Sequence, residues 1–143
     1  MHNAAATFVP KEQVKEFLPF ALPWLERTLS ETAYTRWTLD GIVEDLQSGA
    51  LQLWACTYEG KRMFLVTELI HELTGVTVHV VLGGGQFSPA MTRYLDLIEI
   101  WARSMGATGF VIWGRMGWSK FLRPLGFQFE TAVFRRTFKE RLN

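Results

Sequence analysis

Residues 88–106, SPAMTRYLDLIEIWARSMG, restrict the fold of this chain more than any other stretch of its sequence. Ser88 is a natural N-cap, and Pro89 stands at the first helical position, where a missing N–H removes no hydrogen bond. Apolar side chains then recur every three or four residues, as on one face of an amphipathic helix, and Gly106 ends the pattern. They are Met91, Tyr94, Leu95, Ile98, Trp101, Ala102 and Met105. Strand-like runs precede and follow this helix, so the sequence predicts an α/β fold.

Three strand-like segments precede that helix and follow one another closely. They are LQLWACTYEG, RMFLVTELIHELTG and VTVHVVLGGG, separated by turns at Glu59-Gly60-Lys61 and at Gly75. β-Branched and aromatic residues bounded by such turns predict an antiparallel meander. Further strands are expected in ATGFVIWG, residues 107–114, and in FQFETAVFRRTF, residues 127–138.

Three further helices are expected. Residues 11–29 have amphipathic spacing, but Pro19 and Pro23 predict either a kink or two short helices, because proline removes a backbone donor. Thr38 is suited to cap a helix that Gly49 ends, and a short helix lies in GRMGWSKFLRPLGF before Gly126. The predicted order is α-α-β-β-β-α-β-α-β. It describes a mixed, mostly antiparallel sheet flanked by helices.

Composition narrows the classes of function. A chain of 143 residues is most simply one domain, 1–143, and its net charge of +1 provides no field that attracts nucleic acid or membranes. The N-terminal residues lack the basic and apolar regions of a secretion signal, and we expect a cytoplasmic protein. The single cysteine, Cys56, excludes an internal disulfide, and a small buried thiol is its expected role.

The element order, with a tail of strand, short helix, Gly126-Phe127 and strand, resembles the GNAT acyltransferase superfamily over roughly residues 38–135. The segments LQLWACTYEG, EIWARSMGA and GRMGWSKFLRPLGF are similar to short GNAT-like proteins of tailed phages and prophages. The resemblance implies a GNAT-like, acyl-CoA N-acyltransferase fold. It also implies acetyl-CoA as cofactor and direct attack of an acceptor amine on the thioester. The phage relatives place the protein in the host cytoplasm or the virion.

The resemblance also implies where the cofactor would bind. In active members, strand backbone orients the pantetheine, and a glycine loop with a helix N-terminus cradles the pyrophosphate. The glycines of that loop would fall near Pro89 and Met91, and neither position is glycine. A glycine run directly after the strand is the alternative anion site, although a flexible strand-to-helix turn capped by Ser88 and Pro89 is the preferred explanation of these glycines. The expected cofactor residues are Val80, Val81, Leu82, Gly83, Gly84, Gly85, Gln86, Ser88, Ala90 and Met91.

The resemblance identifies the general acid and the general base less directly than it identifies the cofactor site. Many members carry a tyrosine as general acid four residues before the Gly-Phe pair, and Leu122 stands there. Water, Tyr94 or Ser119 would have to replace it. For the general base we consider His79 and Glu68, since a near-neutral imidazole or a carboxylate suits proton transfer. His71 and Glu72 are weaker candidates, and no histidine spacing indicates a metal site.

Two hypotheses therefore stand. The first is an acetyl-CoA-dependent N-acetyltransferase-like protein that acts on an unidentified amine. The second is a GNAT-fold protein without catalysis that serves as a phage virion-associated or protein-interaction module, a possible homo-oligomer. Leu122 and Pro89 at functional positions favour the second hypothesis. The basic C-terminal run RRTFKERLN is expected to be a solvated tail or the end of an edge strand, and the alternative is a patch for phosphate or a partner.

Overall fold

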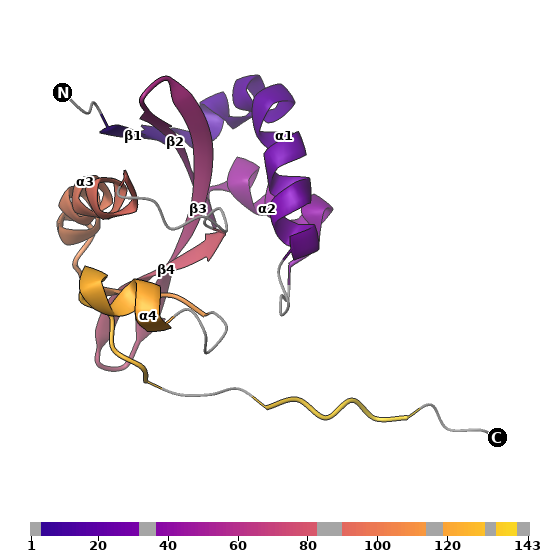
Figure 1. The fold of residues 1–143 in the computed structure, drawn as a ribbon. Coiled ribbons are helices and arrows are strands. Elements are labelled where there is room, and N and C mark those ends of the chain that lie inside the picture. Colours follow the sequence, from indigo (N-terminus) through magenta and orange to yellow (C-terminus); the bar gives the residue numbers. More distant parts are fainter. Residues whose placement is uncertain (1–3, 32–36, 83–89, 114–118, 131–133, 140–143) are drawn as a thin grey trace.

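A computed structural model describes residues 4–31, 37–82, 90–113, 119–130 and 134–139. Its centre is a five-stranded sheet in the order β1-β2-β3-β4-β5 (Figure 1). The strands are β1 (Ala4–Val9), β2 (Gln52–Tyr58), β3 (Lys61–Glu72), β4 (Gly75–Leu82) and β5 (Ala107–Val111). Pairing is antiparallel from β1 to β4 and parallel between β4 and β5. The mixed, mostly antiparallel sheet predicted from the sequence is confirmed.

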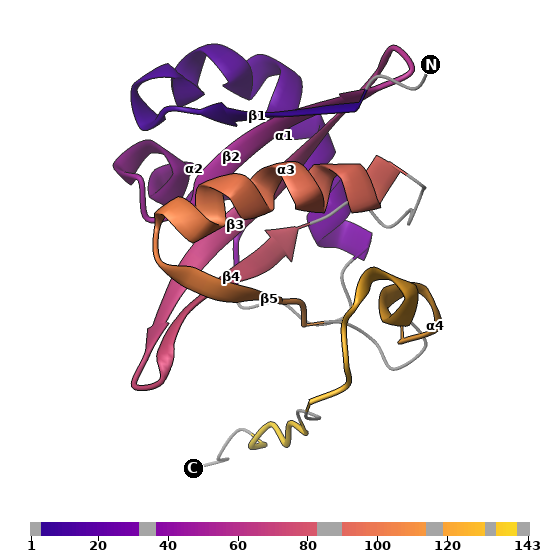
Figure 2. The same ribbon diagram turned by 90° about the vertical axis from the view of Figure 1, so that its left-hand side faces the viewer.

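Helices cover both faces of the sheet. The 3₁₀ turn η1 (Lys11–Gln13), α1 (Val14–Glu31) and α2 (Leu39–Ser48) lie on one face. On the opposite face α3 (Ala90–Ser104) lies across the strands, and α4 (Ser119–Leu122) with the 3₁₀ turn η3 (Arg123–Leu125) sits beyond β5 (Figure 2). We call these the α1/α2 face and the α3 face.

Helix ends follow the local chemistry expected from the sequence. The Thr38 hydroxyl accepts a hydrogen bond of 3.0 Å from the backbone N–H of Gly41 and so caps α2. Gly49, Gly106 and Gly126 follow α2, α3 and η3 with φ of +88°, +82° and +90°. Residues with a Cβ adopt this left-handed conformation only at a cost in free energy, which is why glycine stops helices there.

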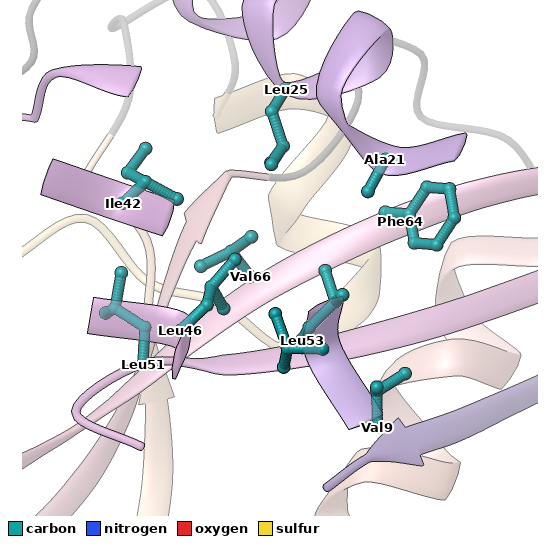
Figure 3. Close-up of a cluster of buried hydrophobic side chains, with 10 residues drawn as sticks. Val9, Ala21, Leu25, Ile42, Leu46, Leu51, Leu53, Phe64 and Val66 are labelled. Carbon is teal, nitrogen blue, oxygen red and sulfur yellow. The ribbon is translucent and has the colours of Figure 1, made fainter. Parts of the chain in front are cut away.

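Two of the hydrophobic clusters among the described residues join the helices to the two faces of the sheet. On the α1/α2 face, Leu25, Leu46, Leu53 and Val66 are fully buried at the centre of the first cluster (Figure 3). On the α3 face, the second cluster joins β2, β3 and β4 to α3. Its buried members are Trp54, Cys56, Leu65, Val80, Tyr94, Leu95 and Ile98. Strands β2 and β3 are therefore buried on both sides, which gives the sheet its rigid centre.

The N-terminal segment differs from expectation in two ways. Residues 4–9 form β1, a strand that the sequence reading missed because its alanines carry no strong strand preference. The two-helix alternative for residues 11–29 is wrong, since α1 is one helix that contains Pro19 and Pro23. Both prolines are exposed, so the carbonyl groups that lose a helical partner lie on the solvent side.

The strand predicted over residues 127–138 is wrong for the residues that the structure describes. Residues 127–130 and 134–139 have no regular secondary structure. Phe127 packs against the second cluster, beside Leu125. Beyond it the chain leaves the body of the protein, and we call residues 128–130 and 134–139 the C-terminal arm (Figure 1). Local alternation alone did not produce a strand, because no strand among the described residues pairs with this segment.

Candidate functional site

A buried histidine and a carboxylate meet on the α1/α2 face of the sheet. His79 on β4 and Glu68 on β3 are directly paired in the register, so their side chains leave the sheet on the same side. His79 Nδ1 lies 2.9 Å from Glu68 Oε1, a hydrogen-bond distance. Only 4% of the His79 side chain and 14% of the Glu68 side chain are exposed. The two residues considered as general base are thus one hydrogen-bonded pair.

The Glu68–His79 pair lies where strands β4 and β5 stop pairing with each other, and we call this point the opening between β4 and β5. The pairing of β4 with β5 ends at His79 and Val111, while β4 continues to Leu82. On the other side, β3 still pairs with β4 as far as Leu82, across an irregularity between Val66 and Thr67. The backbone of β4 beyond His79 therefore faces no β5 residue. Backbone N–H and C=O groups of a strand that lacks a partner strand on one side can hydrogen-bond to a ligand.

Trp113 adds an aromatic wall that the sequence reading did not anticipate. Its ring centroid lies 4.6 Å from that of His79 at an interplanar angle of 37°, and 46% of Trp113 is exposed. The signal that could have found it is its position two residues beyond the end of β5. In an extended chain, side chains two residues apart point to the same side. Trp113 therefore lies on the same side of the sheet as Val111, the residue that pairs with His79 in the β4–β5 register.

The expected cofactor residues are only partly described. Val80 is buried toward the α3 face, and Val81 packs against the first cluster on the α1/α2 face. Leu82 is the last residue of β4, and Ala90 and Met91 are the first two residues of α3. Gly83, Gly84, Gly85, Gln86 and Ser88 lie outside the described residues, so the cap expected at Ser88 and Pro89 is untested.

The candidate acids do not gather at this pair. Tyr94 is buried on the α3 face, and burial there, with smaller contributions from Cys56 and Tyr58, raises its pKa. These neighbours belong to β2, whereas the opening lies between β4 and β5. Leu122, the last residue of α4, has no group that can donate a proton. Neither Tyr94 nor Leu122 therefore places a proton donor beside the Glu68–His79 pair.

His71 and His79 lie on adjacent strands but do not meet. His71 pairs with Val76 near the β3–β4 turn and is exposed, whereas His79 pairs with Glu68. In the pairing of β3 with β4, the position of His71 is three residue pairs away from the position of His79. Within the described part of the chain, no three histidine, cysteine or acidic side chains gather closely enough to bind a metal ion.

A separate hollow of about 460 Å³ lies at another part of the molecule. It is lined by the end of β1, the end of α2 and the last turns of α3, and includes Gln52 and Trp101. The Oε1 atom of Gln52 accepts a 3.0 Å hydrogen bond from Thr67, whose hydroxyl in turn accepts one from Trp54 Nε1. This buried relay satisfies polar groups of the α3 face and does not reach the Glu68–His79 pair.

The buried thiol expected at Cys56 is confirmed, since Cys56 is fully buried and burial raises its pKa from the ordinary value of 9.0 to about 12. We expect it to resist a thiolate-specific reagent at pH 8 in the native protein and to react once the chain is unfolded in guanidinium. The higher folded pKa also means that stability is lost as pH rises between 9 and 12, where only the unfolded thiol ionises. Rapid reaction of the native protein would contradict this placement.

Among the described residues, no helix is both long and apolar enough to span a bilayer. No protein-family model and no curated protein matches the chain. Solved structures do match it. An aminoglycoside acetyltransferase from an uncultured soil sample, crystallised with sisomicin, superposes with a TM-score of 0.65 at 9% identity, over 95% of this chain and 97% of that one.

Two further structures have the same architecture. Glucosamine-6-phosphate N-acetyltransferase of Arabidopsis thaliana gives a TM-score of 0.56 at 13% identity, over 96% of this chain and 99% of that one. A predicted acetyltransferase of Clostridium acetobutylicum, crystallised with acetyl-CoA, gives a TM-score of 0.58 at 12% identity, over 96% of each chain. Identities this low carry information about architecture and not about substrate. The chain has the GNAT acetyltransferase fold.

Proposed function

We propose that this protein is an acetyl-CoA-dependent N-acetyltransferase in which His79 and Glu68 together accept the proton of the acceptor amine. The observation that carries the proposal is the 2.9 Å contact between His79 Nδ1 and Glu68 Oε1, beside the point where β4 and β5 part. A base oriented by a carboxylate at the edge of a ligand opening is the arrangement that proton transfer requires.

The roles of the two side chains follow from their hydrogen bond. An ionised carboxylate only accepts, so Glu68 holds the His79 tautomer that donates from Nδ1. The lone pair of that imidazole is then on Nε2. Nε2 would take the proton as the amine nitrogen bonds to the acyl carbon, the acyl C–S bond would break, and coenzyme A would leave as the thiol with its proton supplied by water. The carboxylate stabilises the imidazolium that forms, as it does in enzymes where an acidic side chain hydrogen-bonds to a catalytic histidine. Burial strengthens this interaction because water does not screen it.

The described residues fit the cofactor along one stretch of backbone. Val80 to Leu82 extend past the last pair with β5, so their outward polar groups can bind the amides of the pantetheine arm. In this proposal Gly83 to Gln86, Ser88, Ala90 and Met91 receive the pyrophosphate. Acetyl-CoA supplies the activated acetyl thioester. The protein residues orient it, exclude water and remove the proton from the amine.

A binding measurement tests this proposal directly. We expect acetyl-CoA to bind the purified chain with measurable heat in calorimetry and to change the fluorescence of its six tryptophans. Trp113 would contribute most, since it lies next to the opening. Adenosine monophosphate, which lacks the pantetheine arm, serves as the control ligand and should bind much more weakly. The absence of both binding heat and a fluorescence change at millimolar acetyl-CoA would contradict the proposal.

The phage or prophage setting is a finer part of the proposal. It rests on the resemblance of LQLWACTYEG, EIWARSMGA and GRMGWSKFLRPLGF to phage-encoded GNAT-like proteins. The acceptor is then an amine of the host cytoplasm or of a phage structural protein. Mass spectrometry of purified particles distinguishes a virion component from a protein that stays in the cell.

A second candidate function has its own supporting observation. Leu122 ends α4 at the position where many active members carry a tyrosine, and the exposed Phe129, Phe134 and Phe138 are suited to protein contacts. A GNAT-fold interaction module without catalysis would have these features. It predicts partner binding with no acetyl-CoA binding, so the same titration separates the two functions.

A further inference from the structure

The hollow of about 460 Å³ at the end of β1 has no part in the function proposed above. The Glu68–His79 pair lies on the α1/α2 face, whereas the hollow is bordered by α3 and by side chains of the α3 face, so the sheet separates the two. Its volume falls within the roughly 300–1,000 Å³ that is usual for small-molecule sites. The chemistry of its walls indicates what it would bind.

Two aromatic rings form one wall of the hollow. Phe8 of β1 and Trp101 of α3 stack with their centroids 5.9 Å apart at an interplanar angle of 22°, and Trp54 meets each of them edge-on at 5.3 Å. The three rings hold one another in place. Phe8 still keeps 39% of its surface exposed, and Met105, which also lines the hollow, keeps 48%. Exposed ring and thioether surface in a concave place suits the flat face of another aromatic ring.

Gln52 contributes a polar group to the same hollow, although only 9% of this residue is exposed. The indole N–H of Trp54 can only donate, so the Thr67 hydroxyl accepts from it and donates its own hydrogen to Oε1 of Gln52. This relay fixes the amide with Nε2 turned away from Thr67. Within the described part of the chain, Nε2 has no hydrogen-bond partner.

The Nε2 atom of Gln52 is accessible to a ligand. Across the described residues, the one completely buried side-chain nitrogen or oxygen without a partner is Oγ1 of Thr77. Nε2 of Gln52 also lacks a partner and is therefore not completely buried, and the hollow is where this residue borders open space. A donor already held in position loses little entropy when it binds, and a ligand oxygen would give it the partner that nearly all buried polar groups have.

We propose that this hollow is a second binding site, for a small planar aromatic molecule that carries a carbonyl oxygen. The ring lies against Phe8 and Trp101, and the carbonyl oxygen accepts a hydrogen bond from Nε2 of Gln52. Lys11 and Glu12 at the rim are both exposed and carry opposite charges, so the rim provides no net attraction for an ion. The site therefore favours a neutral molecule.

The test uses coumarin, a neutral molecule of two fused rings with a carbonyl oxygen and no hydrogen-bond donor. It is titrated into the ¹⁵N-labelled full chain and followed by NMR. We expect a dissociation constant of about 1 mM or lower, as for a ligand of this size in a preformed site. The side-chain amide signal of Gln52 and the indole signal of Trp101 should shift. Spectra of Gln52→Glu and Trp101→Phe identify these two signals.

Gln52→Glu keeps an oxygen that accepts from Thr67 but replaces the Nε2 donor with a second acceptor. It should weaken coumarin binding at least about tenfold, measured on the Trp101 signal, because the carbonyl oxygen loses its donor and meets a carboxylate. Naphthalene has the same fused rings without oxygen, and the substitution should change its binding much less. Gln47→Glu is the matched control, since Gln47 is exposed on α2 and does not line the hollow.

Met105→Glu decides the question independently of how Gln52→Glu folds. Met105 follows the end of α3 and is exposed, so the variant should fold, while the loss of apolar wall should weaken coumarin binding about fivefold. His79→Gln should bind coumarin as the native chain does, and Gln52→Glu should bind acetyl-CoA as the native chain does. Failure of this proposal and failure of the proposed catalytic function are thus seen separately.

Four results would overturn the proposal. Coumarin at millimolar concentration shifts neither the Gln52 nor the Trp101 signal, or it binds both glutamate variants as tightly as the native chain. Gln52→Glu weakens coumarin and naphthalene equally, which would exclude the hydrogen bond to the carbonyl oxygen. Acetyl-CoA displaces coumarin, which would place coumarin at the opening between β4 and β5 instead of in the hollow.

Discussion

His79→Gln should reduce the rate of acetyl transfer by about 100- to 10,000-fold, the usual contribution of a positioned general base. Glutamine preserves much of the volume of the side chain and can still hydrogen-bond to Glu68, but it cannot take up a proton at neutral pH. The loss should appear in kcat, while the dissociation constant for acetyl-CoA stays unchanged. A coupled assay for free thiol, run with a panel of primary amines, measures the first quantity, and calorimetry measures the second.

The control for this substitution is His71→Gln, on the neighbouring strand. His71 is exposed and lies opposite Val76, so its replacement should leave the rate within about twofold, as surface changes normally do. Glu68→Gln should fall between the two, because the amide can still accept from Nδ1 but no longer stabilises an imidazolium. Equal activity of His79→Gln and the native chain would remove the pair from the mechanism without affecting the fold.

Leu53→Ala should lower the free energy of unfolding by about 2–5 kcal/mol, the range for a large aliphatic side chain cut back in a packed core. Leu53 is fully buried at the centre of the first cluster, between β2 and the helices of the α1/α2 face (Figure 3). The surrounding residues belong to strands β1 and β3 and to helices α1 and α2, and they cannot all relax into the space. Chemical denaturation followed by tryptophan fluorescence gives the difference.

Leu73→Ala provides the matched control for the same chemical change. Leu73 lies beyond the end of β3 at the β3–β4 turn and is completely exposed, so it has no packing to lose. Its substitution should shift the free energy of unfolding by no more than about 0.5 kcal/mol. Similar losses for the two variants would show that Leu53 is not at the centre of the core.

The elements that the sequence predicted correctly have strong local signals. Thr38 and Gly49 delimit α2, and the Glu59-Gly60 turn joins β2 to β3. The elements that it missed depend on distant partners. Strand β1 is a strand because β2 pairs with all six of its residues, whereas residues 127–130 and 134–139 have no strand beside them.

The candidate site divides in the same way. The sequence singled out His79 and Glu68 separately, as residues whose pKa and position suit a base, but it did not pair them. They are eleven positions apart, and only the β3–β4 register places them side by side. Trp113 was missed because its contact with His79 depends on the parallel pairing of β4 with β5, which a linear pattern does not encode.

The sequence by itself determined the α/β class, the order of most elements and the helix ends, because these depend on side-chain periodicity and on residues with unusual backbone preferences. The tertiary structure alone decided which residues meet. It joined Glu68 to His79, ended the β4–β5 pairing beside them and directed the C-terminal arm away from β5. Contacts between strands depend on register and sheet order, and these are set by packing across the whole domain.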